Sequence, residues 1–341
     1  MVNKPDSSRL LDIIESFEGL KVAIYGDFVL DEFIYGEISR VSREAPVLIL
    51  DFSSSTVVPG GGANSVNNIK ALDAIPVPVG IVGNDEAGSK LLEILKKRKI
   101  DTTYVKIENG FATPVKTRIL AGSAHTTKQQ VIRLDRGSKN FSLAQASLAA
   151  MKKRLTKAIA ASDGLLIADY NHGSVDAGLC MKILASKKKA RHIVTLDSRK
   201  RILEFKGVTA ATPNEEEVEH ALDRKIGNDE KALRSGGVRL LKAIRAQALL
   251  ITRGSKGMSL FAQGRHISDI PVHGTDEVAD VTGAGDTVIS TFTLSLMAGA
   301  CFHEAAIIAN YAGGIVVMKR GTATISRKEL AEAIGSDHSH S

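Results

Sequence analysis

The run Asp280-Val-Thr-Gly-Ala-Gly-Asp286 places two glycines and a carboxylate directly before a long apolar segment. Gly283 and Gly285 permit a tight turn that leaves successive backbone N–H groups pointing outward. A helix that begins after this turn contributes further unpaired N–H groups and the positive end of its dipole. We therefore predict that Gly283, Ala284 and Gly285 form an anion hole able to hold the oxygens of a transferred phosphoryl group.

Asp286, the last residue of this run, has two interpretations. Its carboxylate can accept a proton from a substrate hydroxyl and so turn that hydroxyl into a nucleophile. Alternatively, it only caps the helix that follows, which is a frequent use of aspartate. The run by itself does not separate a general base from a cap.

Two more carboxylates, Asp27 and Asp31, follow the apolar run at residues 21–26. If this run is a strand, both carboxylates lie at its carboxyl end, where open α/β sheets bind ligands. Two short carboxylates there suit a polyol, because each can accept a pair of hydrogen bonds from hydroxyl groups.

The glycine cluster Pro59-Gly-Gly-Gly-Ala-Asn64 opens a predicted helix. The bare backbone at Gly61 can approach a ligand closely, and the Asn64 amide can bond sugar hydroxyls. The alternative is a loop followed by a helix N-cap. Asn64 is therefore a candidate sugar-binding residue beside Asp27 and Asp31.

The signatures of several other enzyme classes are missing from the sequence. There is no Gly-Lys-Ser/Thr triplet, which excludes a Walker A loop. Gly283-Ala-Gly-Asp-Thr-Val288 ends in Val and lies late in the chain, so a dinucleotide fingerprint fits poorly. Neither a His-Glu-x-x-His zinc motif nor a Gly-x-Ser-x-Gly nucleophile elbow occurs.

The charge of the chain indicates which classes of binding partner to expect. The 341 residues carry a formal net charge of +7, but the basic residues are scattered among acidic ones. The densest basic cluster, at residues 187–191, is typical of a helix end. Without a basic stripe and interleaved aromatics, we expect no nucleic-acid partner. An excess of positive charge does suit a small polyanionic substrate.

The N-terminal residues Met-Val-Asn-Lys-Pro-Asp contain no apolar signal region. The least charged stretch, residues 287–302, is shorter than the roughly 20 residues that a membrane span needs. It is predicted to be a buried core helix. Cys180 and Cys301 lack metal-ligand spacing and are predicted to be buried thiols in a reducing compartment. We expect a cytoplasmic protein without a membrane partner.

Short apolar runs alternate with helical segments along most of the chain. This alternation predicts βαβ units, and hence an α/β fold with a mostly parallel sheet and helices on both faces. The predicted strands are residues 21–26, 77–82, 164–168, 192–197 and 248–252, and the predicted helices are residues 8–17, 63–71, 89–99, 143–161, 176–189 and 235–245.

Residues 33–53 and 112–135 break this rhythm and indicate pairs of alternating strands with no helix between them. Such inserted strands can form a small lid over an active site. The alternative is a few additional edge strands. We predict one domain over residues 1–335. The tail at 336–341 is predicted to be disordered, and its two histidines are not expected to bind a metal.

Six short motifs occur in an order that resembles the ribokinase (PfkB) family of carbohydrate kinases, and the last is that family's specific signature. The resemblance covers almost the whole chain. It implies a ribokinase-like fold that transfers the γ-phosphoryl group of ATP to an alcohol. The matching runs are Gly26-Asp27 with Asp31, Gly60 to Asn64, Val82 to Asp85, Thr212 to Glu217, Thr252 to Gly257 and Asp280 to Asp286.

The resemblance also implies roles for individual residues. Asp286 would be the base beside the anion hole. The residues that would hold the sugar are Asp27, Asp31, Gly61 and Asn64. Asn214 and Glu217 match the family's Asn-x-x-Glu motif, which organises Mg²⁺ near the phosphates. A monovalent-cation requirement stays open, and paired lids in the family suggest a homodimer through the lid. The residues that would line the adenine nucleotide site are Thr252, Gly254, Gly257 and Asn310.

Within the family, the sequence is most similar to kinases that phosphorylate O1 of a heptose 7-phosphate in lipopolysaccharide precursor synthesis. The similarity rests on residues 35–36, 40–46, 116–118, 129–135 and 321–324. A phosphorylated substrate needs cations, which Lys116, Arg118 and Arg133 on the predicted lid could supply. The alternatives are that these are exposed strand charges that discourage edge pairing, and that the acceptor is another sugar, such as fructose or ribose, or a nucleoside.

Two departures from the pattern affect these expectations. Related kinases often show Asp-Tyr-x-Lys-Gly, whereas this chain has Asp169-Tyr-Asn-His172-Gly173. Because histidine is at most partly charged at pH 7, phosphate affinity at His172 would be weaker or pH-dependent. The 341 residues also leave no room for the nucleotidyltransferase domain fused to this kinase in many bacteria. We therefore expect the stand-alone kinase or a relative with another sugar.

Overall fold

The computed structural model of this protein describes residues 6–123, 126, 128–138, 141–186, 192–264, 267–274, 280–319 and 321–338. Its centre is a nine-stranded sheet, parallel except at one edge, where β12 pairs antiparallel with both of its neighbours. In order across the sheet, the strands are β13 (Ser268–Ile270), β12 (Met258–Ala262), β11 (Ala248–Thr252), β10 (Ala210–Ala211), β9 (Ile193–Ser198), β8 (Gly164–Asp169), β1 (Lys21–Gly26), β4 (Ile75–Gly83) and β5 (Val105–Glu108).

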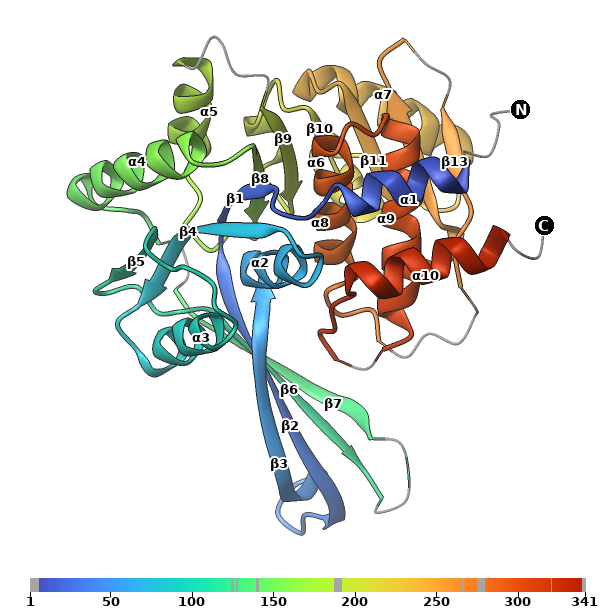
Figure 1. Ribbon diagram of the computed structural model, residues 1–341. Helices are drawn as coiled ribbons and strands as arrows, with labels where there is room; N and C mark the ends of the chain where they lie inside the picture. The colour runs from blue at the N-terminus through green and yellow to red at the C-terminus, as the bar shows by residue number, and fades with distance from the viewer. Residues whose placement is uncertain are drawn as a thin grey trace.

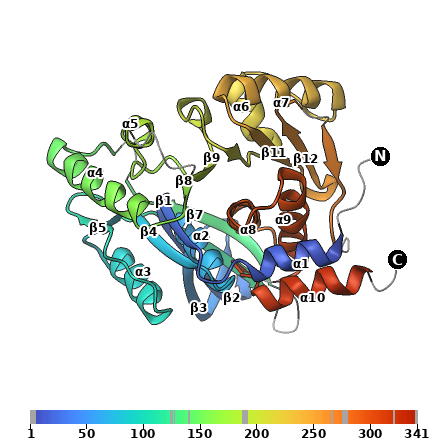
Figure 2. The ribbon, with the colours of Figure 1, turned by 45° about the horizontal axis from the view of Figure 1, so that its top comes forward.

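Helices cover both faces of this sheet, as Figure 2 shows with the top of the molecule turned toward the viewer. One face packs against α4 (Gln145–Ala160), α5 (Ala177–Ser186), α6 (Glu215–Leu222) and α7 (Glu230–Ile244). The other face packs against α1 (Ser7–Glu15), α2 (Gly62–Ala71), α3 (Glu86–Lys97), α8 (Ala284–Met297), α9 (Phe302–Val317) and α10 (Arg327–His338).

Strand β1 shows why the central strands are continuously apolar. Val22 and Ile24 belong to the hydrophobic core on one face, and Ala23 and Tyr25 belong to the core on the other. Successive side chains of a strand point to opposite faces, so a strand buried on both faces needs apolar residues at every position. The predicted α/β class with helices on both faces is confirmed.

A second sheet projects away from the large one (Figure 1). Its order is β3 (Leu48–Gly61), β2 (Phe28–Val41), β6 (Val115–Gly122) and β7 (Gln129–Arg136). The two strand pairs predicted at residues 33–53 and 112–135 are present as antiparallel hairpins. They join into one sheet through the parallel pair β2–β6, which sequence periodicity did not predict.

Several helix boundaries differ from the prediction: α3 begins at Glu86 and not at 89, α7 begins at Glu230 and not at 235, and two more differences lie near the C-terminus. The predicted core helix at residues 287–302 ends at Met297, because the chain turns at Gly299, whose φ is 87°, and α9 begins only at Phe302. Helix α10 continues to His338, three residues beyond the predicted domain boundary at 335, because Leu330 and Ile334 anchor it in the core. The basic cluster at 187–191 and residues 339–341 lie outside the described residues.

None of the helices within the described ranges is long and apolar enough to cross a membrane.

Candidate active site

Two adjoining pockets lie where α8 begins. Their volumes are about 280 and 210 Å³, and Thr252, Val281 and Gly285 line both. The lining of the larger, polar pocket includes Asp31, Gly61, Lys116, Arg118, Tyr170, Asp197, Arg199, Glu217 and Asp286. The lining of the smaller, largely apolar pocket includes Gly254, Gly257, Met258, Val272, Ala284, Val288, Asn310 and Val317.

The predicted anion hole is the first turn of α8. Gly283 is the N-cap and has a φ of 83°, the left-handed region that favours glycine. Because glycine has no side chain, it cannot accept from the N–H groups of the first turn. The Ala284 N–H donates to the Val281 carbonyl at 3.3 Å, and the first-turn N–H groups that follow it are left for an anion. Gly283 and Gly285 line the polar pocket, and Ala284 and Gly285 line the apolar one.

Asp286 lies in the first turn of α8, but it does not cap the helix. Its Oδ2 accepts a hydrogen bond of 2.8 Å from the Asn64 side-chain amide, and its Oδ1 accepts one from the Tyr170 hydroxyl. The N-cap is Gly283, three residues earlier. The cap interpretation is therefore wrong.

Burial raises the pKa of the Asp286 carboxyl to about 6, although the bonds from Tyr170 and Asn64 partly oppose this increase. Only 5% of the residue is exposed. A carboxylate with a pKa close to neutrality is well matched to accept a proton at physiological pH.

Asp31 is held at the wall of the polar pocket. Its Oδ1 accepts a bond of 2.7 Å from Arg118, so the charge of Arg118 is already paired. Gly60 lies so close that a Cβ there would be 2.4 Å from the Asp31 carboxylate. A side chain at position 60 would therefore displace the Asp31 carboxylate.

Two predicted sugar-binding residues are not on the pocket wall. Asp27 is fully buried, and its carboxylate accepts bonds of 2.8–3.0 Å from the backbone N–H groups of Tyr170, His172 and Ser174. Asn64 is also fully buried, and its amide donates to Asp286. The strand-end rule placed Asp27 near the site and the glycine cluster placed Asn64 there, but both side chains bond protein groups instead of facing the cavity.

The three cations predicted on the lid have different environments. The Lys116 ammonium lies 5.3 Å from the centre of the Tyr170 ring, and Lys116 lines the polar pocket. Burial lowers the Lys116 pKa, and Arg199 adds to this effect. Arg133 bonds Asp135 on the exposed strand β7 and lines neither pocket, so the structure does not bring it to the site.

Sequence reasoning missed Tyr170 and Arg199. Tyr170 directly follows β8, and Arg199 directly follows β9. The Arg199 guanidinium lies 4.6 Å from the centre of the Tyr170 ring, and both residues line the polar pocket. Applying the strand-end rule to every parallel strand, not only to β1, would have found both.

The residues implied for a nucleotide site are gathered in the apolar pocket. Thr252, Gly254, Gly257 and Asn310 all line it. Asn310 also donates a bond of 2.8 Å to the carbonyl of Pro271. A small, mostly apolar cavity beside an anion hole suits a flat base whose phosphates extend toward the hole.

Asn214 and Glu217 also line the polar pocket. They form a reciprocal cap of α6: Asn214 Oδ1 accepts from the Glu217 N–H at 2.8 Å, and the Glu217 carboxylate accepts from the Asn214 N–H at 2.9 Å. Burial raises the pKa of Glu217, and burial together with the charge of Glu217 raises the pKa of Asp197.

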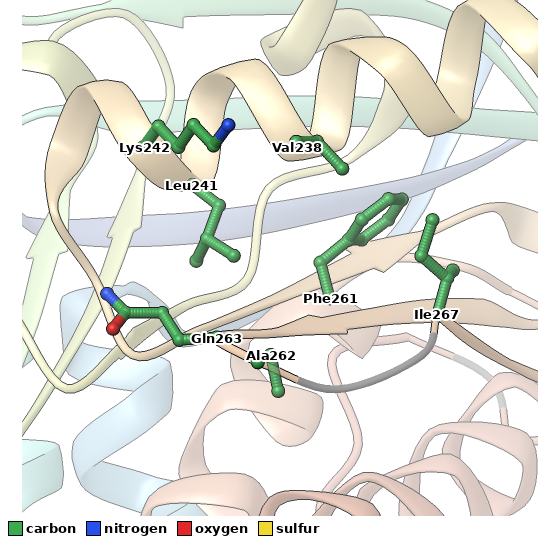
Figure 3. Close-up of a pocket in the computed structure, with 8 residues that line it drawn as sticks. Val238, Leu241, Lys242, Phe261, Ala262, Gln263 and Ile267 are labelled. Carbon is green, nitrogen blue, oxygen red and sulfur yellow. The ribbon is translucent and has the colours of Figure 1, made fainter.

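A further pocket of about 350 Å³ lies on the body between α7 and β12 (Figure 3). It is lined mainly by Val238, Leu241, Phe261 and Ile267, with Lys242 and Gln263 at its polar side. None of the predicted site residues lies in it. No group of three or more His, Cys, Asp or Glu side chains suited to a metal occurs among the residues that the structure describes.

Comparisons with known proteins agree with this geometry. The family described as "pfkB family carbohydrate kinase" matches residues 21–329. A protein named "Bifunctional protein HldE" from Desulfatibacillum aliphaticivorans is 35% identical over 319 residues, which cover 93% of this chain and 63% of that protein. The protein of the same name from Psychromonas ingrahamii is 36% identical, with 94% of this chain and 65% of that protein covered. The chain thus spans about two thirds of the length of these relatives.

Solved structures show the same fold at low identity. Arabidopsis thaliana ribokinase, complexed with ribose and ATP, has a TM-score of 0.69 and 19% identity, with 93% of this chain and 98% of that chain covered. Escherichia coli phosphofructokinase-2, in complex with substrates and products, has a TM-score of 0.73 and 14% identity, with 93% and 99% covered. Since a family match of this extent spans nearly all the strands and helices described above, the chain belongs to the pfkB family of carbohydrate kinases.

Proposed function

We propose that the protein transfers the γ-phosphoryl group of ATP to the O1 hydroxyl of a heptose 7-phosphate, a step in the synthesis of ADP-heptose for lipopolysaccharide. The main observation in support of kinase chemistry is that two pockets adjoin at the N-terminus of α8. A polar pocket with a buried carboxylate and an apolar pocket share the wall at Gly285.

In this proposal Asp286 accepts the proton of the sugar hydroxyl as that oxygen attacks the γ-phosphorus. The first-turn N–H groups of α8 stabilise the charge on the transferred group. ADP leaves from the apolar pocket lined by Thr252 and Asn310. Asp31 and the backbone of Gly61 hold the sugar, because both line the polar pocket beside the base.

The residues present fit a Mg²⁺ ion bound mainly by phosphate oxygens and water. Mg²⁺ usually takes only one or two protein carboxylates in phosphoryl-transfer sites. Glu217 supplies one beside the pocket, and Asn214 fixes its orientation through the reciprocal cap. When bound, the ion would neutralise charge on the β- and γ-phosphates.

Two cations support a phosphorylated acceptor. Lys116 and Arg199 line the polar pocket, and neither has a carboxylate within salt-bridge distance among the described residues. Arg118, which is paired with Asp31, is less available. Unpaired cations on the wall of a pocket attract a doubly charged phosphate.

One observation favours the alternative of a neutral sugar as acceptor. Burial, together with Lys116 and Arg199, lowers the pKa of His172 to about 4. His172 is therefore neutral at pH 7, so it offers no charge where related kinases often have lysine, and its titration causes no pH dependence near neutrality.

The decisive experiment measures ADP release with ATP, Mg²⁺ and a panel of heptose 7-phosphate, fructose 6-phosphate, fructose and ribose. The expected result is turnover with heptose 7-phosphate and a phosphorus NMR signal of a new phosphate at O1. Turnover only with a neutral sugar would overturn the heptose assignment. Absence of turnover with every alcohol would overturn the kinase proposal itself.

A further inference from the structure

Each of the two oxygens of the buried Asp286 carboxylate accepts a hydrogen bond from a different side chain. Asn64 donates to Oδ2 at 2.8 Å, and the Tyr170 hydroxyl donates to Oδ1. Each carboxylate oxygen has two lone pairs, so both oxygens keep one for a substrate hydroxyl. The direction of those remaining lone pairs is set by the two donors.

The loop that carries Tyr170 is itself fixed by a buried charge. Asp27 Oδ2 accepts from the N–H groups of Tyr170 and His172 at 2.9 and 3.0 Å, and its Oδ1 accepts from that of Ser174 at 2.8 Å. Charge-assisted bonds of this kind are among the strongest in proteins. They hold a loop whose tight bend needs φ values of 61° at Asn171 and 94° at Gly173.

The other donor is oriented just as firmly. Asn68 donates to the Asn64 side-chain oxygen at 3.3 Å, and the Thr287 hydroxyl donates to the Asn68 side-chain oxygen at 2.9 Å. This relay turns the nitrogen of the Asn64 amide, and not its oxygen, toward Asp286. If the Asn64 amide were flipped, its oxygen would face the Asp286 carboxylate, and two hydrogen-bond acceptors would meet with no proton between them.

We infer that Tyr170 is a positioning residue that fixes the orientation of the Asp286 carboxylate for proton transfer, and that Asp27 acts on the base through Tyr170. The inference rests on the proposed role of Asp286 as the base. In this account Asp27, which the sequence indicated as a sugar ligand, helps to orient the base and does not contact the substrate.

Tyr170 is suited to this role at every physiological pH. Burial raises the pKa of its hydroxyl well above the ordinary value, so the hydroxyl remains a proton donor. Its ring is held beside Lys116 and Arg199, at 5.3 and 4.6 Å from the ring centre. The other charged groups that affect Asp286 and Tyr170 are Asp31 on β2 and Asp197 on β9.

The test removes the hydroxyl and keeps the ring. Tyr170→Phe should lower kcat by about 10- to 100-fold, the cost of a slightly misplaced reacting group, with little change in the sugar KM. Because the Tyr170 bond lowers the Asp286 pKa, the variant should also move the acid limb of kcat/KM to higher pH. Tyr104→Phe, at a partly buried tyrosine beside β5, is the matched control and should change neither quantity.

A second readout does not depend on turnover. The Asp286 carboxyl carbon is assigned by NMR as the aspartate signal lost in Asp286→Asn, and its pKa is measured by titration. Tyr170→Phe should raise this pKa, and a fluorotyrosine at 170, a stronger donor, should lower it. An unchanged pKa in both proteins would overturn the inference, whereas a shifted pKa in a protein without kinase activity would overturn only the proposed function.

The part assigned to Asp27 is tested with a double-variant cycle. If Asp27 acts through Tyr170, Asp27→Asn combined with Tyr170→Phe should lower kcat little more than the more severe single variant. If the kcat losses of the two single variants multiply in the double variant, Asp27 acts independently of Tyr170. If Asp27→Asn does not fold, circular dichroism will show it, and the Tyr170 measurements still decide the main inference.

Discussion

The base of this site lies in an environment that favours its uncharged form. Burial raises the pKa of Asp286 from 3.8 to about 6, which corresponds to about 3 kcal/mol. A carboxyl with a raised folded-state pKa stabilises the fold below its ordinary pKa. That contribution is lost as the pH rises through about 6. We therefore expect the ionised Asp286 to lower the free energy of unfolding at neutral pH, where its carboxylate is able to act as a base.

This conflict predicts opposite effects of Asp286→Asn on activity and stability. The variant should lower kcat by about 10²–10⁴, the usual contribution of a positioned base. Its melting temperature should exceed that of the wild type at pH 8, and the difference should shrink toward pH 4. Differential scanning calorimetry across this range measures it, with Asp12→Asn on the exposed side of α1 as a control. A difference that does not vary with pH would contradict the buried-base account.

Lys116 and Arg118 are predicted to differ although they are two residues apart on β6. Lys116→Ala should raise the KM for a sugar phosphate by about 10-fold or more and leave the KM for a neutral sugar nearly unchanged, since a charge-assisted bond is lost. Arg118→Ala should raise both, because it removes the partner of Asp31. Lys128→Ala, just before β7, is the control for a lid cation outside both pockets. Equal effects of Lys116→Ala on both sugars would exclude a phosphate contact.

The sequence identified residues better than it identified their orientation. Asp286, Thr252 and Asn310 were predicted from motifs and resemblance, and all three line the adjoining pockets. Asp27 was misassigned because a strand end fixes the place of a residue but not what its side chain meets. The N–H groups that hold Asp27 lie more than 140 residues later in the chain, beyond any local pattern.

At the scale of elements, the site depends on how α8 begins. Gly283 needs its left-handed φ, and a Cβ there would be 2.6 Å from the Asn64 amide nitrogen. Apolar runs predicted the strands and helices around this turn, because buried parallel strands are apolar throughout. The antiparallel pair β12–β13 and the parallel pair β2–β6 escaped prediction, since pairing between distant strands leaves no local period.

The start of α8 gives an element-scale prediction with a control just beyond the other end of this helix. Gly283→Ala and Gly299→Ala both put a side chain at positive φ, and each should destabilise the fold by about 1 kcal/mol. Only Gly283→Ala should also displace Asn64 and lower kcat, because nothing lies within 4 Å of a Cβ at Gly299. Urea denaturation and steady-state kinetics measure the two effects. Similar kinetic losses in both variants would mean that helix stability, not the anion hole, controls activity.

At the scale of the whole molecule, the four-stranded sheet has two different faces. Asp31, Lys116 and Arg118 are on the face that lines the pocket. The strand register places Ile38, Phe52, Ile132 and Leu134 on the opposite face, because they pair with residues that alternate with the pocket-lining ones. Phe52 is 71% exposed, and Ile132 and Leu134 are 56% and 54% exposed. Exposed apolar residues gathered on one face are typical of interaction surfaces.

We predict that this apolar face pairs with its copy in a homodimer. A twofold axis buries the same residues on both subunits, so one substitution changes the interface twice. Phe52→Asp and Ile132→Asp should therefore raise the dimer dissociation constant by more than about 10-fold, which light scattering at graded protein concentrations measures. Val238→Asp, at an exposed apolar residue on α7, is the control and should leave the assembly unchanged. A wild-type protein that stays monomeric at micromolar concentration would refute the pairing. Dimers that survive both substitutions would place the interface elsewhere, and in that case the apolar face would serve only to stiffen the sheet that carries Lys116 and Arg118.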